Sequence, residues 1–381
     1  MGGVRKSVGH VRNGTCTTGI GFERRGAFSV AFAEFDDQGE AIEPEQTIAI
    51  KAMASKLASE EQDVIFVVFV HGWRHNAWPD DENLVQFERL LAETAEVERQ
   101  QERPREVFAI YISWRGLSFY GNDFIEFATF WGRQKAARRV SNGSVRELLG
   151  YLRHYRDERR KNPHNTPMVV IAGHSFGGLI VYSALEQSLI ESASAPSEHI
   201  IPGFADLVLL INPAFEGSRF LPIYRLRKAL EGRDIAQVPI FVCAYAENDQ
   251  ATRFYFPTGN FFSSLTESSR GRLQTSAKNH TIGNIPDFKT HDLDLLAGTE
   301  NFTLKPDPNA RQPNPFWVVK AKKEVIDGHN GIWQPPFLRF LKSLLWAKAE
   351  TTRAGTTGPQ RASAGYRGKL SDLGSGSPRD R

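Results

Sequence analysis

A serine lies at the centre of Gly173-His174-Ser175-Phe176-Gly177, between an apolar run and a segment typical of a helix. The run is Met168-Val169-Val170-Ile171-Ala172, and the helix-like segment spans Gly178 to Leu185. A serine at the apex of a strand, a tight turn and a helix is held on a strained corner, with its hydroxyl above the sheet and the helix amino terminus beneath it. The flanking glycines leave room where the two backbones approach. Ser175 is therefore predicted to be a nucleophile for acyl transfer.

Acyl transfer by a serine also needs a base, an acid that orients the base, and N–H donors for the oxyanion. His329 is the preferred base, because it lies in the glycine-flanked stretch Gly328-His329-Asn330-Gly331, between the last strand-like segment and the closing helix. His280 and His291 also follow Ser175 and precede the last strand, so both remain rivals.

Asp249 is the preferred acid, because it lies just past the strand-like segment 240–244. The strand, turn and helix around a nucleophilic serine are called a nucleophile elbow. Asp249 gives the chain order serine, aspartate, histidine that this arrangement requires. Glu216 is the next candidate and Glu247 a third. A carboxylate in a polar surface loop with no chemical role is the structural alternative for each.

The oxyanion donors are expected in His71-Gly72-Trp73, which follows the apolar run Val64–Val70. The backbone N–H groups of Trp73 and Phe176 are predicted to bind the oxyanion together. We interpret His71 as a residue that orders this loop by hydrogen bonding rather than as the base. His174 is set aside, because a direct neighbour on a tight turn cannot readily reach the hydroxyl of Ser175.

Strand-like and helix-like segments alternate along the chain. Strands are expected at 28–35, 64–70, 107–113, 168–172, 207–211, 240–244 and 316–321, and helices at 46–58, 80–101, 124–157 with a break near Asn142-Gly143, 178–185, 221–230 and 336–347. This alternation predicts an α/β fold with a mainly parallel, twisted sheet and helices on both of its faces.

Three parts of the chain are distinguished by composition. We expect a flexible basic segment over 1–24, an α/β domain over 25–350, and a disordered basic tail over 351–381 that is rich in Gly, Ser, Thr, Pro and Arg. Within the domain, 252–315 is long for a connection between two strands and could form a lid or cap. Its aromatic residues either line an acyl or aryl pocket or pack the segment onto the sheet, and packing is favoured. They are Phe254, Tyr255, Phe256, Phe261 and Phe262.

Charge and cysteine content limit the class of protein. The formal net charge is +3, but both ends are basic and the middle is acidic, which argues against a nucleic-acid-binding surface. The longest apolar run, Val64–Val70, is far shorter than the roughly 18 to 20 residues of a membrane-spanning helix. No hydrophobic signal core follows Met1, so export is not predicted.

Cys16 and Cys243 form no disulfide framework, and Cys243 lies in an apolar segment, which indicates a buried thiol and a reducing, cytoplasmic location.

The motifs together resemble those of a known family. Phe69-Val70-His71-Gly72-Trp73, the pentapeptide around Ser175, Glu247-Asn248-Asp249 and Gly328-His329-Asn330 are similar to the α/β-hydrolase superfamily, and within it to the poorly characterised bacterial serine-esterase-like group. The similarity covers about residues 25 to 348. It implies an α/β-hydrolase fold and the activity of a cofactor-free esterase, lipase, thioesterase, peptidase or acyltransferase. The fold alone does not settle the substrate.

These residues predict a serine hydrolase that cleaves a carboxylic ester or thioester through an acyl-enzyme, with Ser175, His329 and Asp249 as its triad. We expect a small-molecule ester or acyl substrate, no cofactor, no nucleic acid and no integral membrane association. A metal is not expected, because the histidines and cysteines lack the usual ligand spacing. The alternatives are a lipase or acyltransferase that uses the same triad, and a binding protein on a hydrolase scaffold.

Overall fold

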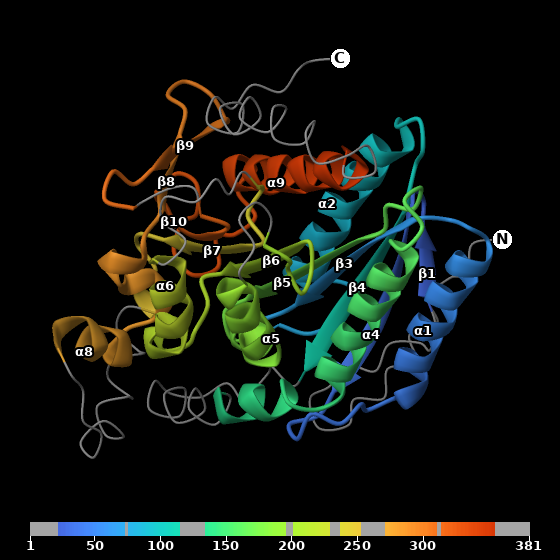
Figure 1. Ribbon diagram of the computed structural model, residues 1–381, viewed down its shortest axis with the longest axis horizontal. Coiled ribbons are helices and arrows are strands. Elements are labelled where there is room, and N and C mark those ends of the chain that lie inside the picture. The colour runs from blue at the N-terminus through green and yellow to red at the C-terminus, as the bar shows by residue number, and fades with distance from the viewer. Residues whose placement is uncertain are drawn as a thin grey trace. The chain divides into compact units, whose positions relative to one another are not determined.

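The fold was analysed in a computed structural model, which describes residues 22–72, 75–114, 134–195, 201–228, 237–252, 271–310 and 314–354. The protein is a mixed α/β protein (Figure 1). Its chain divides into two compact units, Met1–Leu185 and Glu186–Arg381, and the boundary falls inside helix α5, Phe176–Ser194.

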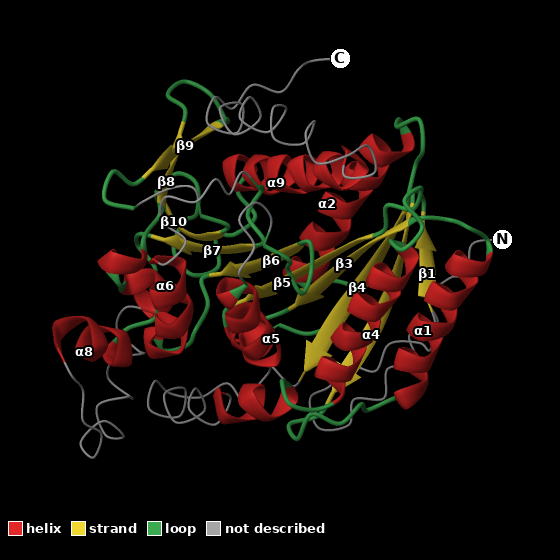
Figure 2. Ribbon diagram, in the orientation of Figure 1, coloured by secondary structure: helices red, strands yellow, loops and turns green. Residues whose placement is uncertain are grey.

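The sheet of the first unit contains five strands in the order β1-β2-β4-β3-β5 (Figure 2). Their bounds are Phe22–Arg25 (β1), Phe28–Phe35 (β2), Val64–Val70 (β3), Glu106–Trp114 (β4) and Met168–His174 (β5). β1 pairs antiparallel with β2, and the remaining pairs are parallel. In the register of β3, Val67 lies between Ala109 of β4 and Val170 of β5. The carboxyl ends of β3 and β5 therefore lie side by side.

Strand β3 is buried along its whole length because helices cover both of its faces. The ring of Phe66 lies 5.4 Å from that of Tyr155 in α4 (Ser144–Arg159), and the ring of Phe69 stacks at 5.2 Å on Phe87 in α2 (Glu82–Arg99). Successive side chains of a strand point to opposite faces, so α4 and α2 cover opposite faces of the sheet. This packing explains why the strand has an uninterrupted apolar sequence.

Helix α1 (Pro44–Ser59) runs beside α4, as Figure 1 shows. The two helices are joined by an ion pair of 2.5 Å between Lys51 Nζ and Glu147 Oε1. The hydroxyl of Tyr151 also donates a hydrogen bond of 3.0 Å to the carbonyl of Lys51. α1 begins with proline, whose fixed φ and missing N–H suit the first turn of a helix.

The sheet of the second unit contains five strands in the order β6-β7-β10-β8-β9. Their bounds are Leu207–Ile211 (β6), Phe241–Ala246 (β7), Phe316–Ala321 (β10), His291–Leu295 (β8) and Phe302–Pro306 (β9). The first four strands pair parallel, and β9 pairs antiparallel with β8. Parallel pairing places the carboxyl ends of β6, β7 and β10 at one edge of this sheet.

Helices pack on this second sheet through aromatic side chains. Phe220, in the 3₁₀ turn η1 (Gly217–Phe220) before α6 (Leu221–Lys228), stacks on Phe241 of β7 with ring centroids 5.7 Å apart. Helix α9 (Pro335–Ala354) meets β9 where Phe340 contacts Phe302 edge-on at 5.5 Å. The remaining elements are α8 (Gly271–Asn279), η3 (Ile282–Asn284) and η4 (Pro286–Phe288).

All seven expected strands are present, and those at 28–35, 64–70, 207–211 and 316–321 have the expected bounds. The expected helices of the described residues are also present, although part of 124–157 and residues 229–230 lie outside them. Every helix of the described residues is too short or too polar to cross a bilayer. Cys243 is buried in β7, as expected, and burial raises the pKa of its thiol. Cys16 lies outside the described residues.

Three expectations about the ends and the long connection need correction. Residues 22–24 of the segment expected to be flexible over 1–24 belong to strand β1, and residues 1–21 lie outside the described residues. Residues 351–354 of the tail expected to be disordered belong to helix α9, and residues 355–381 lie outside the described residues. In the connection 252–315, strands β8 and β9 extend the sheet, and the five aromatic residues expected to line a pocket or pack there lie outside the described residues.

Candidate active site

Ser175 is the single residue between strand β5 and helix α5. Its φ of +56° lies in the left-handed region, which residues with a side chain rarely adopt. The carbonyl of Ser175 accepts a hydrogen bond of 3.2 Å from the N–H of Leu179, so the helix begins directly at the serine. The strand, turn and helix expected around Ser175 are confirmed, and the serine sits on the strained corner between them.

The glycines of the pentapeptide are required by close backbone approaches. A Cβ on Gly173 would lie 2.5 Å from the carbonyl oxygen of Gly177. A Cβ on Gly177 would overlap the carbonyl oxygen of Val70, at the end of β3. Gly72 is equally close to the elbow, because a Cβ there would lie 3.0 Å from both His174 Nδ1 and the Cβ of Ser175. The loop after β3 therefore lies directly against the serine turn.

The predicted oxyanion donors belong to these two segments. Phe176 is the first residue of α5 and directly follows Ser175. Its side chain is fully buried and packs edge-on against Trp114, with ring centroids 6.4 Å apart. Trp73 follows Gly72 but lies outside the described residues, so its role stays a prediction.

His71 orders the loop after β3, as expected. The N–H of Trp114 donates to His71 Nε2 at 3.2 Å, so Nδ1 carries the proton and donates to the carbonyl of Gly72 at 2.8 Å. The indole N–H of Trp114 donates to the carbonyl of His71 at 2.9 Å. Burial lowers the pKa of His71 to about 4. A neutral imidazole with both nitrogens bonded holds the loop and does not act as a base.

The first unit also contains a histidine and carboxylate pair that the sequence interpretation missed. His75 Nδ1 lies 3.2 Å from both carboxylate oxygens of Asp81. Asp81 caps helix α2 through the backbone N–H groups of Asn83 and Leu84. Burial raises the pKa of Asp81, but the hydrogen bond and charge of His75 outweigh burial and leave it below its ordinary value. Because Asp81 is held by capping bonds, we assign this pair to ordering the segment just before α2.

In the second unit, the structure brings together the predicted acid and base. His329 Nδ1 lies 2.8 Å from Asp249 Oδ2. The side chain of Asp249 is 2% exposed and that of His329 is 20% exposed. Asp249 follows β7, and His329 follows Gly328, whose φ of +68° is favoured only by glycine. The pair therefore has a buried acid and a histidine that reaches the surface.

The carboxyl group of Asp249 is stabilised in its charged form. Burial raises its pKa, but the charge and hydrogen bond of His329 oppose burial, as do bonds from Thr252, whose N–H donates to Oδ1 at 3.1 Å. The net effect is a pKa below the ordinary value. A charged Asp249 favours the tautomer of His329 that donates from Nδ1.

The rival residues have structural roles in the described chain. His291 is buried against Trp317, with ring centroids 4.2 Å apart, and burial followed by the charge of Arg227 lowers its pKa to about 3. His280 Nδ1 bonds the carbonyl of Ser276 in the preceding helical turn at 2.9 Å. Glu247 pairs with Lys320 and Lys322, at 3.4 and 3.1 Å.

Glu216, the second candidate for the acid, belongs to a single bridge with Thr281 and precedes η1. Within the described part of the chain, no group of three or more His, Cys, Asp and Glu residues could hold a metal ion.

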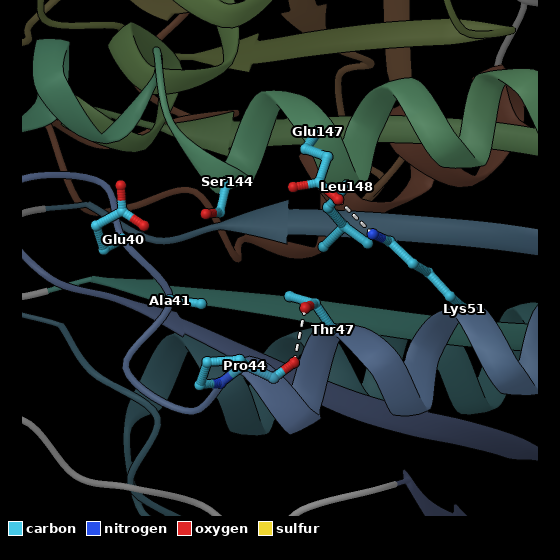
Figure 3. Close-up of a pocket in the computed structure, with 8 residues that line it drawn as sticks. All are labelled: Glu40, Ala41, Pro44, Thr47, Lys51, Ser144, Glu147 and Leu148. Atoms are coloured by element: carbon cyan, nitrogen blue, oxygen red, sulfur yellow. Dashed lines mark hydrogen bonds and ion pairs between the residues drawn. The ribbon is translucent and has the colours of Figure 1, made fainter.

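A pocket of about 180 Å³ lies between the first turns of α1 and α4 in the first unit (Figure 3). Thr47 and Ser144 line it together with Glu40 and the Lys51–Glu147 ion pair. None of the predicted site residues lines this pocket. It is separate from the elbow and contributes nothing to the assignment of Ser175.

Two asparagines that the sequence interpretation missed hold the histidine loop. Asn212, directly after β6, donates to the carbonyl groups of Gly328 and His329, and Asn248 accepts from the N–H of Gly328 at 2.9 Å. Polar residues at the carboxyl ends of parallel strands are a signal that could have identified both.

Comparisons with known proteins add structural neighbours of low similarity. No protein-family model and no curated protein sequence matches the chain. Phospholipase PlaB from Legionella pneumophila is 13% identical, with 81% of this chain and 64% of that chain covered and a TM-score of 0.30. Acyl-protein thioesterase 2 from Zea mays is 10% identical, with 76% and 95% covered and a TM-score of 0.27. The chain thus spans less than two thirds of the length of phospholipase PlaB, and the functional assignment rests on the chain's own residues.

Proposed function

We propose that the protein is a serine hydrolase that cleaves an ester-type bond, either a carboxylic ester or a thioester. Ser175 is the nucleophile, His329 the base and Asp249 the acid that orients it. The observation that carries the proposal is Ser175 in the left-handed conformation between a parallel strand and a helix. Such strain persists in folded proteins where the surroundings enforce it, and it is concentrated at functional sites.

The Asp249–His329 pair supports the same reaction. With the proton on Nδ1 and bonded to Asp249, Nε2 has the lone pair that a base requires. When Nε2 takes the proton of the Ser175 hydroxyl, the imidazolium formed is stabilised by the carboxylate 2.8 Å away. A buried and charged acid beside a partly exposed histidine is the electrostatic arrangement that this proton transfer needs.

The chemical steps follow from these roles. The serine oxygen adds to the substrate carbonyl carbon while its proton moves to His329, and the carbonyl electrons form an oxyanion. We assign the oxyanion to the backbone N–H of Phe176, with that of Trp73 as the second donor. Collapse of the intermediate expels the alcohol or thiol, which takes the proton from His329. Water then repeats the sequence on the acyl-enzyme and releases the acid.

The experiment is covalent labelling by a fluorophosphonate probe, which reacts with an activated serine. We expect one labelled site, mapped to Ser175 by peptide mass spectrometry, and no labelling of S175A. S183A, on the same helix α5, is the matched control and should label like the wild type. Labelling that persists in S175A would refute the assignment. A panel of p-nitrophenyl esters and thioesters of graded acyl length then defines the substrate class.

A further inference from the structure

Asn212 occupies an unusual place at the carboxyl end of β6. Its φ is +44°, in the left-handed region that asparagine tolerates better than other residues with a side chain. The residue is 1% exposed. Its backbone N–H donates to the carbonyl of Ala244 at 2.9 Å, which continues the pairing of β6 with β7. The buried amide side chain therefore projects from a backbone that is fixed on the neighbouring strand.

Each hydrogen-bonding atom of the Asn212 amide has a partner on one of two segments. The side-chain oxygen accepts from the N–H of Ala246, the last residue of β7, at 2.8 Å. The side-chain nitrogen donates to the carbonyl groups of His329, at 2.8 Å, and Gly328, at 3.2 Å. One side chain thus ties the strand end that leads to Asp249 to the loop that carries His329.

A second amide braces the same loop from the turn after β7. Asn248 donates to Asp327 Oδ1 at 2.8 Å and accepts from the N–H of Gly328 at 2.9 Å. The histidine is consequently fixed at two points. Its ring is held by Asp249 and its backbone carbonyl by Asn212.

We infer that Asn212 is a positioning residue for the Asp249–His329 pair, and this inference rests on the proposed function. Its amide sets the distance between the acid turn and the histidine loop, and so the direction of His329 Nε2. Aspartate has nearly the same shape but no N–H to donate, and its charge would face two carbonyl oxygens. Displacements of about 1 Å at a reacting group can cost about 10²-fold in rate.

The test compares N212D and N212G with N314A. Glycine accepts the positive φ without strain but lacks the amide, so N212G keeps the test valid should N212D fail to fold. Asn314 is the matched control, because it is also a buried asparagine of the second unit. Its side chain accepts from the N–H of Phe316, the first residue of β10, whereas the His329 loop follows the other end of that strand. We expect kcat to fall roughly 10- to 100-fold in both Asn212 variants with KM nearly unchanged, and to stay within about 2-fold of wild type in N314A.

A readout that does not depend on activity is the NMR signal of the His329 Nδ1 proton, assigned by its absence in H329A. We expect this low-field signal in the wild type and N314A, and its loss or broadening in N212D and N212G. An unchanged signal and unchanged kcat in both Asn212 variants would overturn the inference, as would an equal loss of kcat in N314A at equal unfolding stability. Should Ser175 fail to label in the wild type, the proposed function fails, and the NMR comparison still decides whether Asn212 positions the histidine.

Discussion

The left-handed backbone of Ser175 makes a prediction that is independent of any substrate. Alanine and glycine both remove the hydroxyl, but only glycine adopts a φ of +56° without steric cost. The left-handed conformation costs a residue with a Cβ about 1 to 2 kcal/mol. Glycine gives back about 0.4 to 1 kcal/mol, because its unfolded chain has more freedom to lose. We therefore expect S175G to be more stable than S175A by about 0.5 to 1 kcal/mol.

The assay is equilibrium urea unfolding. Hydrogen exchange of the β3 and β5 amides then measures the stability of the first unit separately. Glu61 provides the calibration, because its φ is +54° and it lies exposed just after α1, where no chemistry is proposed. E61G should exceed E61A in stability by a similar amount. If E61G shows this gain and S175G is no more stable than S175A, the elbow is not strained and the reasoning fails.

Three further outcomes follow from the described contacts. D249N should fold but lose about 10⁴-fold in kcat, because an amide no longer holds His329 in the required tautomer, and a loss below 10-fold would contradict the role of Asp249. H75A should label within about 10-fold of the wild type while H329A labels about 10⁴-fold more slowly, and the reverse order would move the base to the His75–Asp81 pair. Burial lowers the pKa of His71 from 6.5 to about 4, so the folded protein is favoured where His71 is neutral, above pH 6.5. As the pH falls from 6.5 to 4, the free energy of unfolding should therefore decrease by about 3 kcal/mol. In urea titrations across this range, H71Q should show a shallower loss, and an equal slope would place the acid sensitivity elsewhere.

The sequence predicted most of the parts that depend on local pattern. The run Val64–Val70 predicted a strand covered on both faces, and β3 has those bounds. The glycines around Ser175 predicted a tight turn, and the backbone approaches explain them. The strands β8 and β9 were missed because four of their ten residues are charged or histidine, a composition that resembles a loop.

One contact of the candidate site was predicted from residues that follow strands and carry chemistry. Asp249 and His329, chosen by their order along the chain, lie within hydrogen-bond distance. The place of Asn212 directly after strand 207–211 was a local signal, but its neighbours in the sequence do not show which groups its amide binds. These groups include those of Ala246 and His329, which lie 34 and 117 residues further along the chain. Contacts of this range depend on the register of the strands, which local pattern does not specify.

The residue after Asn212 has a consequence for how the protein ages. Asparagine converts to aspartate spontaneously when the next backbone nitrogen attacks the side-chain amide and closes a ring. The next residue is Pro213, whose backbone nitrogen carries no hydrogen and cannot take part in this closure. The amide that joins the acid turn to the histidine loop is thus chemically durable. Pro213 protects the protein from acquiring, by slow chemistry rather than by mutation, the N212D change that we expect to lower kcat.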